Sequence, residues 1–195
     1  MIDARAATAL PVPQVTHLGR HKRRQNIEGH PLFVDKRESH MPVRERITIL
    51  GDTSVGFNVF QPVGESAANL KGDLMLVQAF FRFIVQGTRS GTMTGMQTSK
   101  EVPQVHGRID TLTLAAIRTF QRRWAHNLIN ADGVIHPARY NRNITTSGKG
   151  PLLTITLLHQ LAQNAAAEGF NETDYTELMF RLFPNLRLET WNLAQ

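Results

Sequence analysis

The chain has 195 residues, of which 41% are hydrophobic, so it is long enough to bury one core of ordinary size. It contains no cysteine, which excludes disulfides, thiolate metal sites and a cysteine nucleophile. Its formal net charge of +6 favours an anionic partner, such as nucleic acid, anionic lipid or an acidic cell-wall polymer.

The first zone of the chain, residues 1–46, is basic, rich in His and interrupted by Pro and Gly. It has no sustained period of 2 or 3.6, so we predict an extended, partly disordered arm. Its cluster RHKRR is either a set of solvated charges or a patch that docks on an anionic surface. The first residues lack the apolar stretch of a signal peptide, and no later run reaches the ~18 apolar residues of a membrane span. We therefore expect synthesis in the cytoplasm and, for a role at the periplasm or cell envelope, delivery by a non-classical route.

The next elements are a short strand and a strongly apolar helix. Ile47, Thr48, Ile49 and Leu50 favour the strand, and a turn is expected at the following Gly-Asp pair. The helix is predicted to begin after Asp73 as its N-cap residue and to end at Gly87.

The apolar arc of this helix extends past half of its circumference. One face carries Leu74, Val77, Phe81, Ile84 and Val85, and three more apolar residues fall beside it, namely Leu76, Phe80 and Phe83. Such an arc needs a cover. Either the arm or the tail of the same chain supplies it, which we favour slightly, or another protein does.

Three further helices are predicted: residues 111–126, a helix from near Pro151 to Gly169, and residues 172–183, ended by Pro184. The chain thus divides into an arm at 1–46, a domain at 47–168 and, at 169–195, an amphipathic helix with a docking tail. The residues predicted to dock on a partner protein are Leu76, Phe80, Phe83, Leu182, Phe183 and Trp191.

Two glycine loops of similar build precede the second and third helices. In the first, Gly107 permits a tight turn, Ile109 is expected to seal it onto the core, and Asp110, or one of the two following Thr residues, is expected to cap the helix. In the second, Asp132 and Gly133 turn the chain, and an Ile at position 135 repeats the apolar seal.

These residues resemble the peptidoglycan-binding-like domain family, which has a small three-helix fold. The matching positions are Gly107, Ile109, Thr113, Ala116, Ile117, Phe120, Gln121, Asp132 and Gly133. An upstream set is similar to a subgroup associated with contractile injection and phage-like lysis systems, through Gly64, Asn69, Asp73, Val77 and Gln78. The resemblance covers residues 54–165. His106 replaces the Asp that the family pattern expects, and Asp110 stands where a second Gly is usual.

The resemblance implies a mainly α fold: a three-helix peptidoglycan-binding-like bundle with a short β element, an extended N-terminal arm and a C-terminal helical tail. It also implies that peptidoglycan is the partner. The residues expected to bind it are Gly107, Arg108, Asp110, Arg122, Asn127, Asp132 and Tyr140. Of these, Arg122 is the candidate for contact with stem-peptide carboxylates.

Catalysis, metal binding and nucleic-acid binding have weaker support. No metalloprotease or paired His motif occurs, and His17 and His21 lie in a segment without helical pattern, so no metal or cofactor is expected. Arg118, Arg122 and Arg123 form a basic helix face without interleaved aromatic residues, so no nucleic acid is expected.

The leading hypothesis is therefore a non-catalytic peptidoglycan-binding module that acts with a cell-envelope-directed secretion or phage-like apparatus. The alternative is a structural adaptor that uses the same fold for protein–protein assembly. A cell-wall lytic enzyme is the weaker alternative.

Overall fold

A computed structural model describes residues 41–49, 52–88, 93–96, 98, 100–125, 129–138 and 154–192, all within one unit, residues 34–195. Several sequence predictions fall outside the described residues: the arm up to residue 40, with His17 and His21, the strand end at Leu50, the turn at Gly51, Asn127, Tyr140, and the helix start at Pro151.

The fold begins with an antiparallel hairpin of β1 (Val43–Ile49) and β2 (Asp52–Asn58). The predicted strand is thus present, but it starts four positions early, at Val43, inside the segment that we assigned to the arm. The second strand was not predicted. A third strand, β5 (Trp191–Asn192), pairs in parallel with the start of β1, so the sheet order is β2-β1-β5.

The central helix, α1 (Lys71–Gly87), ends at the predicted glycine but starts two residues before the predicted N-cap. Asp73 therefore lies inside its first turn, where its carboxylate accepts hydrogen bonds from the backbone N–H groups of Phe60 and Gln61 at 2.7 and 2.9 Å. The prediction that Asp73 caps the helix was wrong because this side chain anchors the preceding loop instead.

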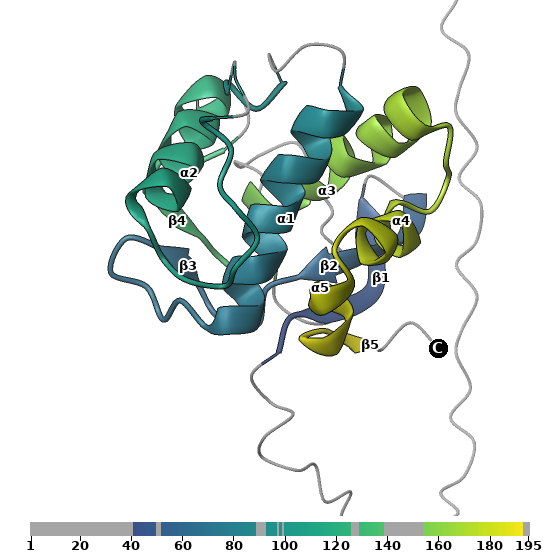
Figure 1. Cartoon of the computed structure of the whole chain (residues 1–195), viewed down its shortest axis with the longest axis horizontal. Coiled ribbons are helices and arrows are strands. Elements are labelled where there is room, and N and C mark those ends of the chain that lie inside the picture. Colours follow the sequence, from purple (N-terminus) through teal and green to yellow (C-terminus); the bar gives the residue numbers. More distant parts are fainter. Residues whose placement is uncertain are drawn as a thin grey trace, which may run out of the picture. The chain divides into compact units, whose positions relative to one another are not determined.

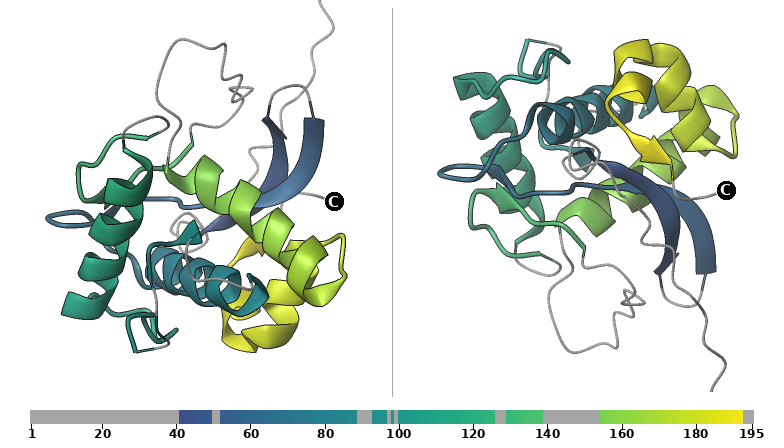
Figure 2. Two further views of the ribbon diagram at one scale, coloured as in Figure 1. Left: turned by 90° about the horizontal axis from the view of Figure 1, so that it is seen from above. Right: turned by 90° about the horizontal axis from the view of Figure 1, so that it is seen from below.

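The remaining helices are α2 (Thr111–Trp124), α3 (Thr154–Ala165), which continues into the π-helical turn η3 (Ala166–Phe170), α4 (Tyr175–Leu182) and α5 (Pro184–Leu188). A two-stranded ribbon joins β3 (Val63–Gly64) to β4 (Val134–Ile135). Figures 1 and 2 show α1 between α2 on one side and α4 with α5 on the other. The described part of the chain is therefore mainly helical, as expected.

The cover of α1 comes from this chain. The side chains of Leu76, Phe80 and Phe83 are 0% exposed, so the prediction that these three dock on a partner protein was wrong. Phe80 packs against Phe57 of β2 and Tyr175 of α4, with ring centroids 6.2 and 6.1 Å apart, and Phe83 stacks on a Phe of η3. Full burial of a side chain of this size contributes about 1.5–3 kcal/mol to folding.

None of the helices in the described ranges has the length and apolar character needed to cross a membrane.

Candidate ligand-binding site

The two glycine loops are both organised by a buried glutamine of the preceding helix. In the first loop, the Oε1 of Gln78 on α1 accepts hydrogen bonds from the N–H groups of His106 and Gly107 at 3.0 and 2.9 Å. Its Nε2 donates to the carbonyl of Arg108 at 2.9 Å and to the hydroxyl of Thr113 at 3.0 Å. Gln78 therefore holds the loop and the first turn of α2 together.

Gln121 on α2 makes the corresponding bonds in the second loop. Its Oε1 accepts from the N–H of Gly133 at 2.7 Å. Its Nε2 faces three oxygens at 2.9–3.1 Å, those of the Asp132 carboxylate, the Val134 carbonyl and the hydroxyl of Thr154, which is the first residue of α3. We call each arrangement, Gln78 with the first loop and Gln121 with the second, a glutamine clamp. Each clamp fixes a glycine loop and the start of the next helix to the helix before it.

The two loop glycines differ in the space around them. Both have positive φ angles, +69° for Gly107 and +77° for Gly133, which L side chains rarely adopt. A Cβ at Gly107 would also lie 2.9 Å from the carbonyl oxygen of Lys71 and 2.8 Å from two side-chain carbons of α1, whereas nothing lies closer than 3.7 Å at Gly133. Gly107 is therefore required by packing as well as by backbone conformation.

The capping prediction for the first loop is confirmed, but its apolar seal is not. The Asp110 carboxylate accepts from the N–H of Thr113 at 2.6 Å. Burial alone would raise the pKa of this carboxyl, but hydrogen bonds from Thr113 and His106 outweigh it and lower the pKa. Ile109 is 41% exposed, so it does not seal the turn, whereas Ile135 of the second loop is fully buried as predicted. Gly107 makes the close approach to α1 in place of an Ile109 side chain.

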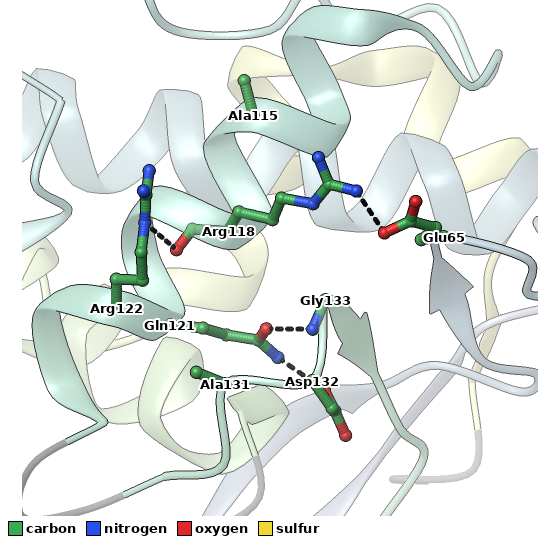
Figure 3. A pocket seen from close by; sticks show the side chains of 8 residues that line it. All are labelled: Glu65, Ala115, Arg118, Gln121, Arg122, Ala131, Asp132 and Gly133. Atoms are coloured by element: carbon green, nitrogen blue, oxygen red, sulfur yellow. Dashed lines mark hydrogen bonds and ion pairs between the residues drawn. The ribbon is translucent and has the colours of Figure 1, made fainter.

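An open pocket of about 470 Å³ lies between the exposed face of α2 and the second glycine loop (Figure 3). The residues that line it are Glu65, Ala115, Arg118, Gln121, Arg122, Ala131, Asp132 and Gly133. Five of these eight residues are polar or charged, and four of the five carry a charge, which suits a ligand with a charged group.

The β3–β4 ribbon brings Glu65 to this pocket. Gly64 passes so close to the second loop that a Cβ there would lie 2.2 Å from the carbonyl oxygen of Gly133. The N–H of Glu65 donates to that same carbonyl at 3.2 Å, and its carboxylate forms an ion pair with Arg118 of α2. One turn later on α2, the Nε of Arg122 donates to the carbonyl of Arg118 at 3.4 Å, and within the described residues Arg122 has no carboxylate partner.

The structure places two of the predicted ligand-binding residues, Arg122 and Asp132, in the pocket lining, while Asn127 and Tyr140 are not described. The other three, Gly107, Arg108 and Asp110, belong to the first loop and do not line this pocket. Asp132 is largely used by its own loop. Its Oδ1 accepts from Gln121 and from the N–H of Val134, and its Oδ2 lies 3.2 Å from the Nε2 of His136.

Glu65, Ala115 and Ala131 were not predicted from the sequence, and Arg118 was assigned only to a hypothetical nucleic-acid face. A partial signal was present, because Arg118 and Arg122 are four residues apart and therefore neighbours on one helix face. No sequence signal placed Glu65 near them, because that proximity depends on the β3–β4 pairing.

A separate buried cluster contains Ser54, His159 and Tyr175. The Nε2 of His159 lies 3.0 Å from the Ser54 hydroxyl, and its Nδ1 lies 2.7 Å from the Tyr175 hydroxyl, which also accepts from the backbone N–H of Phe57. Among the described residues, Nδ1 of His159 is the acceptor available to the buried Tyr175 hydroxyl proton, so we assign the ring proton of His159 to Nε2. Burial lowers the pKa of His159 to about 4.

This assignment makes Ser54 an acceptor from His159, which is opposite to the direction in which a histidine activates a serine nucleophile. The cluster is therefore best explained as satisfied core polarity that ties β2, α3 and α4 together. Among the described residues, no group of three or more His, Asp or Glu side chains could hold a metal ion.

The remaining predicted docking residues lie at the C-terminal end. Leu182 is 41% exposed and Phe183 is half-buried, while Leu188, which was not predicted, is 79% exposed. Trp191 contributes its backbone to β5.

Comparison of the chain with known family models, with curated proteins and with solved structures finds no match.

Proposed function

We propose that the protein is a non-catalytic peptidoglycan-binding module that acts with a cell-envelope-directed secretion or phage-like apparatus. In this proposal α1, α2 and α3 form a three-helix peptidoglycan-binding-like bundle. The observation that carries it is the pair of glutamine clamps. Gln78 and Gln121 are two of the positions through which the sequence resembles that family, and both do the same work in their loops.

The pocket beside the second glutamine clamp is a second argument for a cell-wall ligand. It is open, as recognition of a strand in a hydrated polymer requires, and Arg122 in its lining suits the carboxylates of stem peptides.

The distribution of charge supports the same partner class. Residues 1–40 contain seven Lys and Arg against four Asp and Glu, and residues 139–153 contain three against none. The whole positive excess of the chain therefore resides in these two segments, of which the second follows β4 in sequence. Such an excess favours an acidic polymer through long-range attraction.

Co-sedimentation with purified sacculi at low salt tests the proposal. The wild-type protein is expected in the pellet, and Arg122→Gln is expected to shift it toward the supernatant. Arg123→Gln is the matched control, because it removes the same charge from the neighbouring, exposed residue outside the pocket. Wild-type protein that stays in the supernatant would refute wall binding.

A structural adaptor is the second candidate, favoured by the exposed Leu182 and Leu188. It predicts self-association or stable assembly with another protein, weakened when both leucines are changed to Ser. A wild-type protein that sediments as a monomer at all concentrations, and in which the double substitution changes nothing, would count against it.

A further inference from the structure

The ion pair between Glu65 and Arg118 lies across the candidate pocket, next to a second arginine that has no carboxylate partner in the described part of the chain. Glu65 projects from the loop after β3, and both arginines project from α2, one turn apart (Figure 3). The side chains of Arg118 and Glu65 are 49% and 55% exposed, so water and solutes reach the pair.

We propose that this pocket binds a carboxylate group between Arg118 and Arg122, and that Glu65 competes with the ligand for Arg118. This inference rests on the proposed function, because it names the chemical group that the site would recognise. A carboxylate has two acceptor oxygens, and arginine presents a planar set of donors that matches them. The Glu65 carboxylate is thus a built-in substitute for the ligand.

The loop beside the arginines is not a second anion site. The N–H of Gly133 already donates to Gln121, and that of Val134 donates to Asp132. Because these backbone donors are occupied within the protein, recognition of an anion in this pocket depends on the arginine side chains.

The negative charges that remain in the pocket favour a ligand with a single charge. The carboxylates of Glu65 and Asp132 both line it, and like charges repel at short range. A monocarboxylate meets less repulsion there than a phosphate dianion. The pocket is therefore expected to select a carboxylate over phosphate.

Displacement of Glu65 by a ligand has a small cost. Exposed ion pairs contribute roughly 0.2–1 kcal/mol, so Glu65→Gln is expected to tighten binding of a carboxylate by about 1.5- to fivefold. Loss of Arg122 removes a charged hydrogen-bond donor and is expected to weaken binding by about tenfold or more.

The first test is an NMR titration of the full chain with N-acetylglycine, followed at the backbone amide of Gly133 and the Nε of Arg122. N-acetylglycinamide, the uncharged analogue, and inorganic phosphate are the comparison probes. We expect saturable shifts with N-acetylglycine alone, tighter binding to Glu65→Gln, and weak binding to Arg122→Gln. Glu168→Gln and Arg123→Gln are the matched charge controls and are expected to behave as wild type.

Three results would overturn the inference. They are equal binding of N-acetylglycine and its amide, preferential binding of phosphate, and a Glu65→Gln affinity no tighter than that of Glu168→Gln. Spectra of each variant also report whether it is folded, so a loss of binding through unfolding is recognised directly.

Sacculi distinguish this inference from the proposed function. Binding that is lost when wall carboxylates are converted to amides supports both. Absence of binding to untreated sacculi, with N-acetylglycine still bound in a Glu65-dependent way, refutes the wall function and leaves the carboxylate site standing. Binding that survives amidation but is lost when phosphate polymers are stripped with hydrofluoric acid overturns the choice of carboxylate.

Discussion

Replacement of Gln121 by Leu tests whether the second glutamine clamp stabilises the fold. The side chain of Gln121 is 1% exposed, and its amide is bonded to the glycine loop and to the first residue of α3. Leu has a similar volume, so the change removes the hydrogen bonds while leaving little cavity.

The expected cost follows from the groups that lose their partner. The N–H of Gly133 is buried and bonds to Gln121 at 2.7 Å, and an unsatisfied buried donor costs about 1–3 kcal/mol. The Val134 carbonyl and the Thr154 hydroxyl each lose a bond worth roughly 0.5–1.5 kcal/mol. We expect the free energy of unfolding to fall by about 2–6 kcal/mol, a large fraction of the 5–15 kcal/mol typical of a domain.

Urea unfolding followed by circular dichroism measures this change, with Gln86→Leu as the control. Gln86 lies on the exposed side of α1, and its replacement is expected to change the free energy of unfolding by less than about 0.5 kcal/mol. Hydrogen exchange at the Gly133 amide should accelerate in Gln121→Leu. If Gln121→Leu falls within about 1 kcal/mol of Gln86→Leu, the clamp does not hold the loop as we argue.

Three further predictions concern pH, the loop glycines and the sheet. Burial raises the pKa of Asp73 to about 6 and lowers that of His159 to about 4. Between pH 4 and 6, Asp73 is therefore protonated in the folded state but not in the unfolded state, so its contribution to stability falls as pH rises. His159 is protonated in the unfolded state but not in the folded state, so its contribution to stability increases as pH rises. Urea unfolding measured across this pH range should show that the stability of Asp73→Asn rises more steeply with pH than that of the wild type. Parallel plots of stability against pH for the two proteins would contradict this. Gly133→Ala should lower the free energy of unfolding by about 1–2 kcal/mol. Gly107→Ala should lower it clearly more, because the added Cβ would also meet α1. Equal losses of stability in the two variants would contradict this. Arg44→Met removes one ion pair to the N-cap residue of α4, Asp174, and one to its first turn, at Glu177. It should lower the free energy of unfolding by about 1–2 kcal/mol, and by less at high salt; a loss that is independent of salt would point to packing instead.

The helices were predictable from sequence because their signals are local. The apolar period of α1 and the glycine at its end, and the capping Asp110 of α2, act within a few residues. The signal at Asp73 is also local, because an Asp before an apolar run is typical of an N-cap. Its hydrogen-bond partners, however, lie 12 and 13 residues earlier in the chain, so the capping prediction was wrong.

The cover of α1 and the candidate site were less predictable because distant segments build them. Phe80 is covered by Tyr175, which lies 95 positions later in the chain. Because no sequence pattern places Tyr175 on α1, Phe80 was predicted to dock on a partner although it belongs to the core of this chain. Gln78 and Gln121 were recognised as motif positions, yet on a helical wheel Gln78 belongs to the polar side. Their hydrogen bonds to loop backbone became visible only with the loops in place.

The cover of α1 has a consequence for biosynthesis. Its most apolar side chains are completed only by η3 and α4, so a ribosome must add about 90 more residues after α1 before Phe80 and Phe83 are enclosed. During that interval the nascent chain carries an uncovered aromatic surface, which is the kind of surface that chaperones bind. Phe80 and Phe83 therefore become buried only after α4 has been synthesised, and a chain truncated before Tyr175 should aggregate rather than fold to a smaller version of the same domain.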